Sequence, residues 1–199
     1  MPATSDPRLL HFVTHPEVLI DPAVAVPDWP LSELGRARMR RAVAAPWARA
    51  VDALFCSAER KARDAAAILG AARRLAPVVL EALGENDRSA TGYLPRAEFE
   101  ATADLFFAHP EESIRGWERA VDAQARILRG IEQVLALAGP ARRIAVIAHG
   151  GVGALLLSAL SGQPISRATD QPGEGGGQYF SVALPERRVV AGWRRIEAG

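Results

Sequence analysis

Two histidines stand in equivalent positions, each directly after a short apolar segment. Residues 144–148 end at His149, which two glycines follow, and residues 8–13 lead to His15 through one threonine. In an open α/β sheet, ligands bind at the carboxyl ends of the strands. Glycines at a helix N-terminus let an anion approach free backbone N–H groups, and an imidazole carries protons near neutral pH. The pair therefore predicts an anion site equipped for proton transfer or nucleophilic attack.

Further polar side chains follow two other apolar segments. Ser57 comes directly after residues 51–56, and Glu85 follows residues 77–83. The helix start beyond Ser57 is basic, with Arg60, Lys61 and Arg63. Such a set suits chemistry on a phosphate, since one imidazole can attack phosphorus and a carboxyl can protonate the departing oxygen. Cations, the second imidazole and glycine-turn amides can hold the charge on the other oxygens. The basic residues could instead form only a solvated helix face.

Apolar strand-like segments alternate with amphipathic ones, which predicts a doubly wound α/β sheet. The predicted strands are residues 8–13, 51–56, 77–83, 144–148, 178–184 and 188–193. The predicted helices are residues 32–45, 59–74, 98–107 and 113–138, and one that begins at the glycines after His149. Ser32 and Ser57 are the expected caps of the first two helices, and Trp117 is expected in the core. The last two strands are expected to form a hairpin on Pro185 and Glu186 and to add an antiparallel strand.

Length and composition narrow the class of protein. With 199 residues the chain is expected to form one domain over residues 1–199. A net charge of +1 predicts neither nucleic-acid nor membrane binding, and the absence of a signal peptide or long apolar run favours a cytoplasmic location. Cys56 is the single cysteine, and neither H-x-H nor H-E-x-x-H spacing occurs, so we expect no metal site. A dinucleotide site is disfavoured because Leu156 replaces the third glycine of the required motif, and no cofactor is expected.

Four segments resemble the histidine phosphatase (phosphoglycerate mutase-like) superfamily, in the order in which the family has them. They read VTHPEV, WPLSELGRARM, SAERKARDAAAIL and IAVIAHGGVGALL. The resemblance implies a phosphoglycerate mutase-like α/β fold, a three-layer sandwich whose mostly parallel sheet carries helices on both faces. It also implies that His15 is the phosphate-accepting nucleophile and that His149 is its partner at the phosphoryl group. For the proton donor it implies Glu85, in a Leu-x-Glu-x-Asp-like setting, with Glu81 as the alternative.

The chain departs from the family at its phosphate ligands. Thr14 stands where the family has arginine, Pro16 replaces the following glycine, and Lys61 takes the place of a second arginine. Lysine keeps the charge but loses the bidentate fork, and threonine supplies one hydroxyl. The candidate phosphate ligands are therefore Thr14, Ser57, Lys61, Arg88 and Gly150. Arg60 or Arg63 could also stand in for the missing arginines.

Two functions follow from this resemblance. The first is a phosphomonoester hydrolase, or less readily a phosphomutase, that acts through phosphohistidine on a small phosphorylated substrate. The second is a catalytically weak or inactive member that binds a phosphorylated ligand, inorganic phosphate or a protein partner. Selectivity is expected from the variable segments 17–30 and 89–116, and the glycine-rich loop 172–177 is a candidate lid. The sequence predicts neither the substrate nor the oligomeric state.

Overall fold

A single six-stranded sheet forms the middle of the computed structural model, which describes residues 7–198. The strands are β1 (Arg8–Thr14), β2 (Ala53–Cys56), β3 (Val78–Val79), β4 (Arg143–Ala148), β5 (Gln178–Leu184) and β6 (Arg188–Arg195). Their order is β3-β2-β4-β1-β5-β6. The first four pair in parallel, and β5 runs antiparallel to both β1 and β6. The predicted mostly parallel sheet with a C-terminal hairpin is therefore confirmed.

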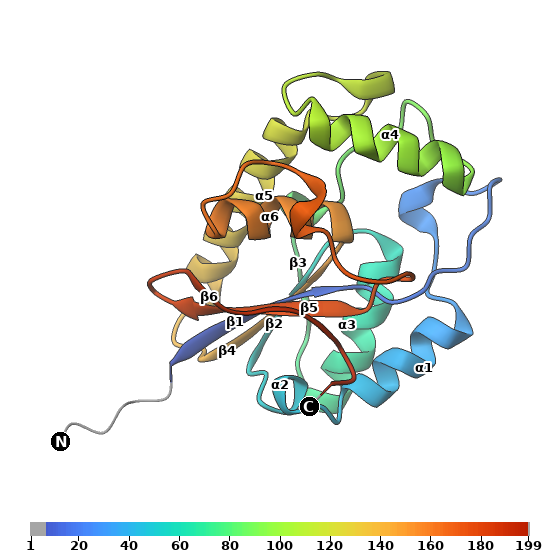
Figure 1. Cartoon of the computed structure of the whole chain (residues 1–199). Helices are drawn as coiled ribbons and strands as arrows, with labels where there is room; N and C mark the ends of the chain where they lie inside the picture. Colours follow the sequence, from blue (N-terminus) through green and yellow to red (C-terminus); the bar gives the residue numbers. More distant parts are fainter. Residues whose placement is uncertain (1–6, 199) are drawn as a thin grey trace.

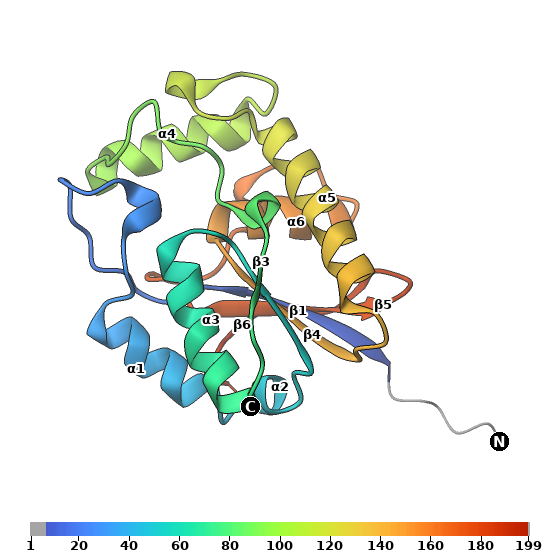
Figure 2. The same ribbon diagram turned by 180° about the vertical axis from the view of Figure 1, so that it is seen from behind.

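Helices cover both faces of this sheet (Figures 1 and 2). One face carries α1 (Glu33–Ala42), α2 (Pro46–Arg49) and α3 (Arg60–Arg73), and the other carries α5 (Ala120–Ala138) and α6 (Gly150–Leu160). A further helix, α4 (Arg96–Ala108), packs onto α5 and α6 through Phe106 and Phe107. The three-layer α/β sandwich expected from the resemblance is thus the observed fold.

The central strands form because their residues are apolar on both faces. In β4, Ala145 and Ile147 pack toward α1–α3, whereas Ile144 and Val146 pack toward α5 and α6. A strand covered on both faces is apolar throughout rather than alternating. The outer strand β6 alternates instead between half-buried and exposed residues along its length. This burial fixes β1 and β4 at the centre, where the two histidine-bearing strand ends lie.

Helix starts differ in part from the sequence prediction. Ser32 caps α1 as expected, because its side chain accepts a hydrogen bond from Gly35 N at 3.1 Å. Ser57 does not cap α3; the cap residue is Glu59, and the Ser57 hydroxyl accepts from Glu59 N at 3.1 Å. The chain thus makes a three-residue turn, residues 57–59, between the end of β2 and the start of α3. This turn leaves the Ser57 hydroxyl near the end of β2, next to His149, rather than at the start of α3.

Two predicted elements are shorter than expected. The third strand contains only Val78–Val79, and Glu81–Leu83 form a 3-10 turn that places Leu83 in the core. The long helix begins at Ala120 rather than residue 113, because Arg115 and Gly116 adopt positive φ angles of 54° and 80°. Such backbone conformations interrupt an α-helix. Trp117 lies beyond this break and is buried, as predicted.

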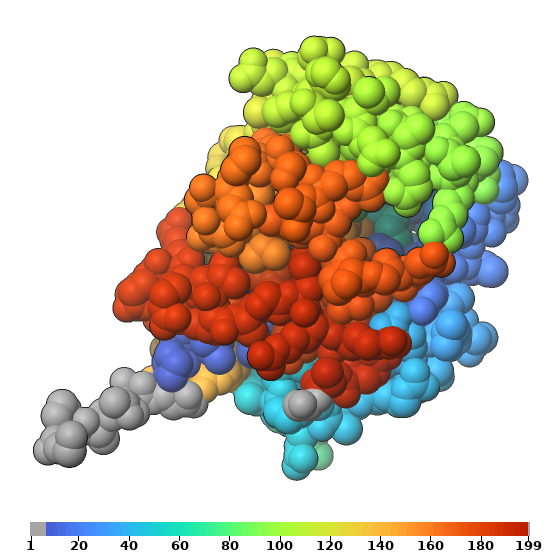
Figure 3. Space-filling model, viewed as in Figure 1, coloured from blue at the N-terminus to red at the C-terminus, as the bar shows by residue number. Residues whose placement is uncertain are grey.

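Residues from distant parts of the chain surround a hollow on the molecular surface. It opens between the glycine-rich loop 172–177, drawn orange, and the blue and green segments around residues 20 and 93 (Figure 3). Within residues 7–198, no helix is both long and apolar enough to cross a membrane.

Candidate active site

The two histidines meet at one edge of the sheet. Strands β1 and β4 are parallel neighbours, and Thr14 pairs with Ala148, so the two strands end at the same edge of the sheet. His15 N donates to Ala148 O at 3.1 Å. The rings of His15 and His149 then lie edge to face, with centroids 5.2 Å apart and planes at 68°. The predicted juxtaposition of the two imidazoles is therefore present.

The His15 ring is fixed in one tautomer. Its Nδ1 lies 2.9 Å from the carbonyl oxygen of Pro16, which can only accept, so Nδ1 carries the proton and Nε2 keeps its lone pair. Burial, with help from His149 and Lys61, lowers the pKa of His15 to about 3. The imidazole is consequently neutral at pH 7, with a free nitrogen available for attack.

The glycine-rich loop contacts the backbone of His15. Gly177 N donates to His15 O at 3.0 Å. The preceding residue, Gly176, has φ +67°, and a Cβ there would lie 2.2 Å from His15 O. Only glycine fits such a close approach in the left-handed region. The glycine-rich loop is therefore packed directly onto the histidine segment.

His149 lies behind His15 and is fully buried. Its Nε2 is 2.8 Å from Ser57 Oγ and 3.3 Å from Glu59 Oε1. Its Nδ1 has no hydrogen-bond partner among the described residues. Burial lowers the pKa of His149, and the carboxylates of Glu59 and Glu85 oppose that shift. A buried nitrogen without a partner is uncommon in proteins, and it marks this ring as a candidate contact for a ligand.

Glu85 sits on the N-terminus of α6. Its Oε2 accepts from Gly151 N at 3.0 Å, and its Oε1 accepts from Val152 N at 2.9 Å. A Cβ on Gly151 would lie 2.7 Å from Oε1, so glycine is needed for the carboxylate to come this close. These are contacts of a carboxylate held at the positive end of a helix. The first helical residue, Gly150, keeps its N–H outside this arrangement.

Lys61 is not open to the cavity. Its Nζ donates to Val26 O at 2.8 Å and forms a short ion pair with Glu59. Glu59 also accepts from Glu85 N, at 2.8 Å. Although burial alone would raise it, the pKa of Glu59 is lowered to about 2 by His149 and Lys61 and by its hydrogen bonds. Glu59 is therefore ionised and neutralises the predicted phosphate ligand Lys61.

Thr14 and Ser57 are likewise occupied. The Thr14 hydroxyl donates to Gln171 Oε1 at 2.7 Å and accepts from Gln178 N at 2.9 Å. Both residues are buried, and neither lines the cavity beside His15. Their hydroxyls hold neighbouring groups in place rather than facing the cavity. Of the five predicted phosphate ligands, only Arg88 and Gly150 reach it.

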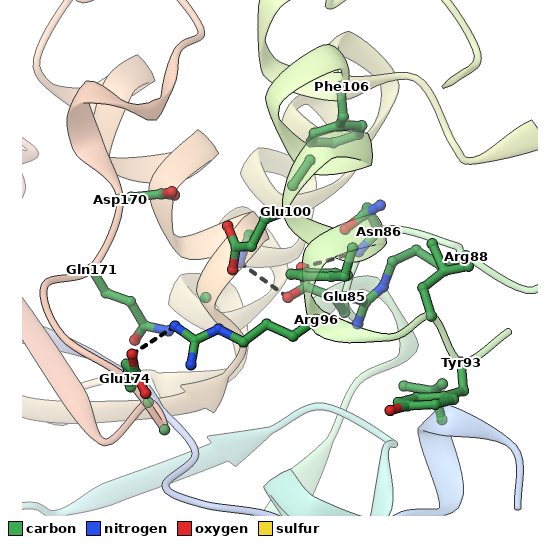
Figure 4. Close-up of a pocket in the computed structure, with 18 of the residues that line it drawn as sticks. Glu85, Asn86, Arg88, Tyr93, Arg96, Glu100, Phe106, Asp170, Gln171 and Glu174 are labelled. Atoms are coloured by element: carbon green, nitrogen blue, oxygen red, sulfur yellow. Dashed lines mark hydrogen bonds and ion pairs between the residues drawn. The ribbon is translucent and has the colours of Figure 1, made fainter. Parts of the chain in front are cut away.

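The cavity has a volume of about 500 Å³ and joins the histidine site to α4 (Figure 4). His15, Glu85, Asn86, Gly150 and Gly151 line its polar end. The opposite wall is apolar and comes mainly from α4 and its flanking segments: Leu94, Phe99, Ala103, Phe106, Phe107 and Trp117. Across the mouth, Arg96 of α4 pairs with Glu174 of the glycine-rich loop at 2.6 Å. The cavity thus offers one polar and one apolar region to a ligand.

Three arginines line the cavity; Arg96 and Arg167 form ion pairs with acidic side chains, whereas Arg88 packs against aromatic rings. Its guanidinium carbon lies 5.0 Å from the ring centroid of Phe99 and 5.7 Å from that of Trp117. The guanidinium itself forms no hydrogen bond or ion pair with any residue that the structure describes. By contrast, Arg60 and Arg63 are exposed on α3 and do not line the cavity. Of the three arginines considered from the sequence, only Arg88 therefore lines the cavity.

Sequence reasoning missed several members of this site. Glu59 lies in a segment whose basic residues dominate its pattern, and its position two residues before Lys61 is the one local signal for it. Gln171, which lines the cavity beside Gly150, had no local signal. Across residues 7–198, no group of three or more histidine, cysteine or acidic side chains is placed to hold a metal ion.

Solved structures share this fold over nearly the whole chain. The native mycobacterial glucosyl-3-phosphoglycerate phosphatase Rv2419c is 25% identical, with a TM-score of 0.74 over 95% of this chain and 97% of that one. The structure of its complex with inorganic phosphate is 24% identical, with a TM-score of 0.74 over 96% of this chain and 100% of that one. Bacillus stearothermophilus YhfR is 20% identical, with a TM-score of 0.75 over 92% and 94%. A comparison with curated protein sequences finds no match.

The family model for the histidine phosphatase superfamily (branch 1) matches residues 17–177. The match contains Glu59, Lys61, Glu85 and His149, and it begins two residues after His15. It covers most of the chain and agrees with both the observed fold and the meeting of the two imidazoles. The chain belongs to the histidine phosphatase superfamily.

Proposed function

We propose that this protein is a phosphomonoester hydrolase that acts through a phosphohistidine at His15. The observation that carries the proposal is the His15 ring, neutral and tautomerically fixed by Pro16, whose neighbour His149 has a buried unpartnered nitrogen. His15 lines the same cavity as Glu85 and Arg88. A nucleophile, an acid–base group and an anion-binding cation thus share one space.

The reaction would proceed in two displacements. Nε2 of His15 attacks phosphorus, the bond between phosphorus and the ester oxygen breaks, and Glu85 protonates the departing alkoxide. Water then attacks the phosphohistidine, Glu85 takes its proton, and orthophosphate leaves. The proton gained in the second step protonates the alkoxide of the next turnover. Because Gly151 and Val152 hold its carboxylate in place, Glu85 is positioned for both transfers.

Two groups would stabilise charge on the transferring phosphoryl oxygens. Arg88 supplies the unpaired guanidinium, and Gly150 supplies the first N–H of α6. Thr14, Ser57 and Lys61 would act indirectly, through Gln171, His149 and Glu59 respectively. Preorganised donors of this kind each contribute about a hundred- to a thousandfold in rate.

The cavity also suggests the class of substrate. Its far wall is formed by apolar side chains, three of which are phenylalanines. A buried apolar wall stabilises apolar ligand surface by roughly 25 cal/mol per Å². The alcohol part of the ester is therefore proposed to be largely apolar or aromatic. The mycobacterial phosphatase solved with inorganic phosphate supports phosphate as the ligand type.

The test is turnover of an aryl phosphate, an alkyl phosphate and a sugar phosphate by wild type and His15→Ala. Wild type should favour the aryl and alkyl esters and form a base-stable, acid-labile phosphoenzyme in a rapid quench. His15→Ala should lose both, whereas His109→Ala, at the exposed end of α4, should retain both. Equal turnover by His15→Ala would remove His15 from the chemistry. The second candidate is a protein that binds a phosphorylated ligand without hydrolysing it. It is suggested by Thr14 and Lys61, whose polar groups are bound to other residues instead of facing the cavity. A wild type that binds phosphate but hydrolyses no ester would favour this candidate.

A further inference from the structure

Glu59 receives the contacts that a bound anion would receive. Its side chain is 14% exposed and lies behind the His15 cavity. Three groups from separate segments converge on its carboxylate: Nζ of Lys61, the backbone N–H of Glu85, and Nε2 of His149 at 3.3 Å. An ammonium, an amide and an imidazole are the donors with which proteins hold oxyanions. The chain therefore fills part of its own anion pocket with a carboxylate.

This carboxylate alters the charge that the site presents to a phosphate. Around the two imidazoles, the cation Lys61 is matched by the carboxylate of Glu59. This pair carries no net charge, and both imidazoles are uncharged near neutral pH. A dianion entering this pocket is attracted by Arg88 but receives little net attraction from the Glu59–Lys61 pair.

We infer that Glu59 is a specificity-determining residue that withholds Lys61 from the phosphoryl group and so makes the site bind free phosphate weakly. The inference rests on the proposed function, because it assumes that the cavity beside His15 admits a phosphate. Binding of an ester then depends on its alcohol part, which contacts the apolar wall. Orthophosphate lacks that part and leaves readily after turnover.

The test measures binding of inorganic phosphate by calorimetry to wild type and Glu59→Gln. Glutamine keeps the size of the side chain and an oxygen for Glu85 N, but it removes the charge on Lys61's partner. The Kd for phosphate should fall by about tenfold, because the substitution removes one negative charge from the surroundings of the phosphate and leaves Lys61 without its partner. Glu111→Gln is the matched control, since Glu111 is exposed and does not line the cavity. Its Kd should equal that of wild type.

Two further measurements show whether the higher affinity of Glu59→Gln for phosphate depends on Lys61. Adding Lys61→Gln to Glu59→Gln should abolish the tenfold gain, as a double-mutant cycle requires for coupled residues. In wild type with ¹⁵N-labelled lysine, the Nζ resonance of Lys61 should stay in place when phosphate saturates the site. The second measurement needs no variant, so it holds even if Glu59→Gln does not fold.

Each outcome decides the matter. Unchanged or weaker phosphate binding by folded Glu59→Gln would overturn the inference, because the carboxylate would then support the anion site rather than compete with it. A shift of the Lys61 resonance on phosphate binding would overturn it too. In both cases hydrolysis by wild type would leave the proposed function standing. If no variant binds phosphate and no ester is hydrolysed, the inference and the proposed function fall together.

Discussion

The carboxylate of Glu85 lies across the first turn of α6, with Oε2 3.0 Å from the backbone nitrogen of Gly151. The close approach is possible because Gly151 has no side chain, since a Cβ there would stand 2.7 Å from Oε1. A residue on the loop after Leu83 is thereby fixed against the helix that follows His149. This one contact aligns the proposed acid–base group with the two imidazoles.

Gly151→Ala should therefore disable catalysis without unfolding the protein. The added methyl group would displace the carboxylate, and a misplaced acid–base group typically costs about a hundredfold or more in rate. Alanine in a helix is more favourable than glycine by about 0.5–1 kcal/mol, which offsets part of any strain. Steady-state kinetics with an aryl phosphate, together with thermal unfolding, would separate the two effects. The control is Gly192→Ala in β6, where a Cβ meets nothing within 4 Å and turnover should be unchanged. Full activity in Gly151→Ala would show that the placement of Glu85 does not matter.

Arg88→Gln should lower kcat/KM by about a hundred- to a thousandfold, because Arg88 is the proposed charge donor on the phosphoryl oxygens. Arg88→Lys should recover only part of the loss, since lysine lacks the planar fork that stacks on Phe99 and Trp117. Kinetics with the same aryl ester would test both variants. Arg63→Gln, on the exposed side of α3, is the comparison and should behave as wild type. If Arg88→Gln were as active as Arg63→Gln, another group must bind the phosphate.

Much of the fold could be predicted because burial leaves a strong pattern in the sequence. β1 and β4 are apolar on both faces, and such strands lie in the middle of a parallel sheet. Two central strands bring their carboxyl ends together, so the meeting of His15 and His149 follows from sequence and topology. The shorter elements could not be predicted this way. Residues Ile114, Trp117 and Val121 keep a helical spacing, but Arg115 and Gly116 turn the backbone out of the helix.

The state of each site residue depends on contacts that no local pattern shows. The position of Lys61 in the sequence predicts a phosphate ligand, yet the carboxylate of Glu59 neutralises its charge. Thr14 aligns with an arginine of the family, yet its hydroxyl bonds Gln171 and Gln178, which lie more than 150 residues away in the chain. Such pairings arise only when the loops around a strand end have packed.

Thr14→Val should reduce stability more than chemistry. Valine has a similar shape but cannot accept from Gln178 N, and a buried donor left without an acceptor costs about 1–3 kcal/mol. Chemical denaturation should report this loss, whereas kcat of the folded protein should fall less than tenfold because Thr14 does not line the cavity. Thr14→Ser retains the hydroxyl and should restore most of the stability. A loss of activity as large as that of Arg88→Gln, at unchanged stability, would mean that the hydroxyl binds the phosphate after all.

Acid should destabilise the protein through its buried neutral histidines. His11 lies in the core beside the stacked rings of Trp47 and Tyr179, with Nδ1 2.8 Å from Ser181 Oγ. Burial, with a contribution from Arg143, lowers the pKa of His11 from 6.5 to about 4. In the unfolded chain His11 therefore binds a proton below about pH 6.5, whereas in the folded chain it binds one only below about pH 4. Since the unfolded state binds more protons in this window, the free energy of unfolding falls as the pH falls.

The size of the effect follows from that difference in pKa. Between pH 7 and pH 5, His11 alone should lower the free energy of unfolding by about 2 kcal/mol. Urea denaturation at the two pH values should show the decrease in wild type. His11→Gln keeps a polar group for Ser181 but does not titrate, so its decrease should be smaller by about 2 kcal/mol. His109→Gln, on an exposed position, should match wild type. Equal pH dependence in His11→Gln and wild type would mean that His11 titrates in the folded protein as it does in the unfolded chain, and that its burial does not hold it neutral.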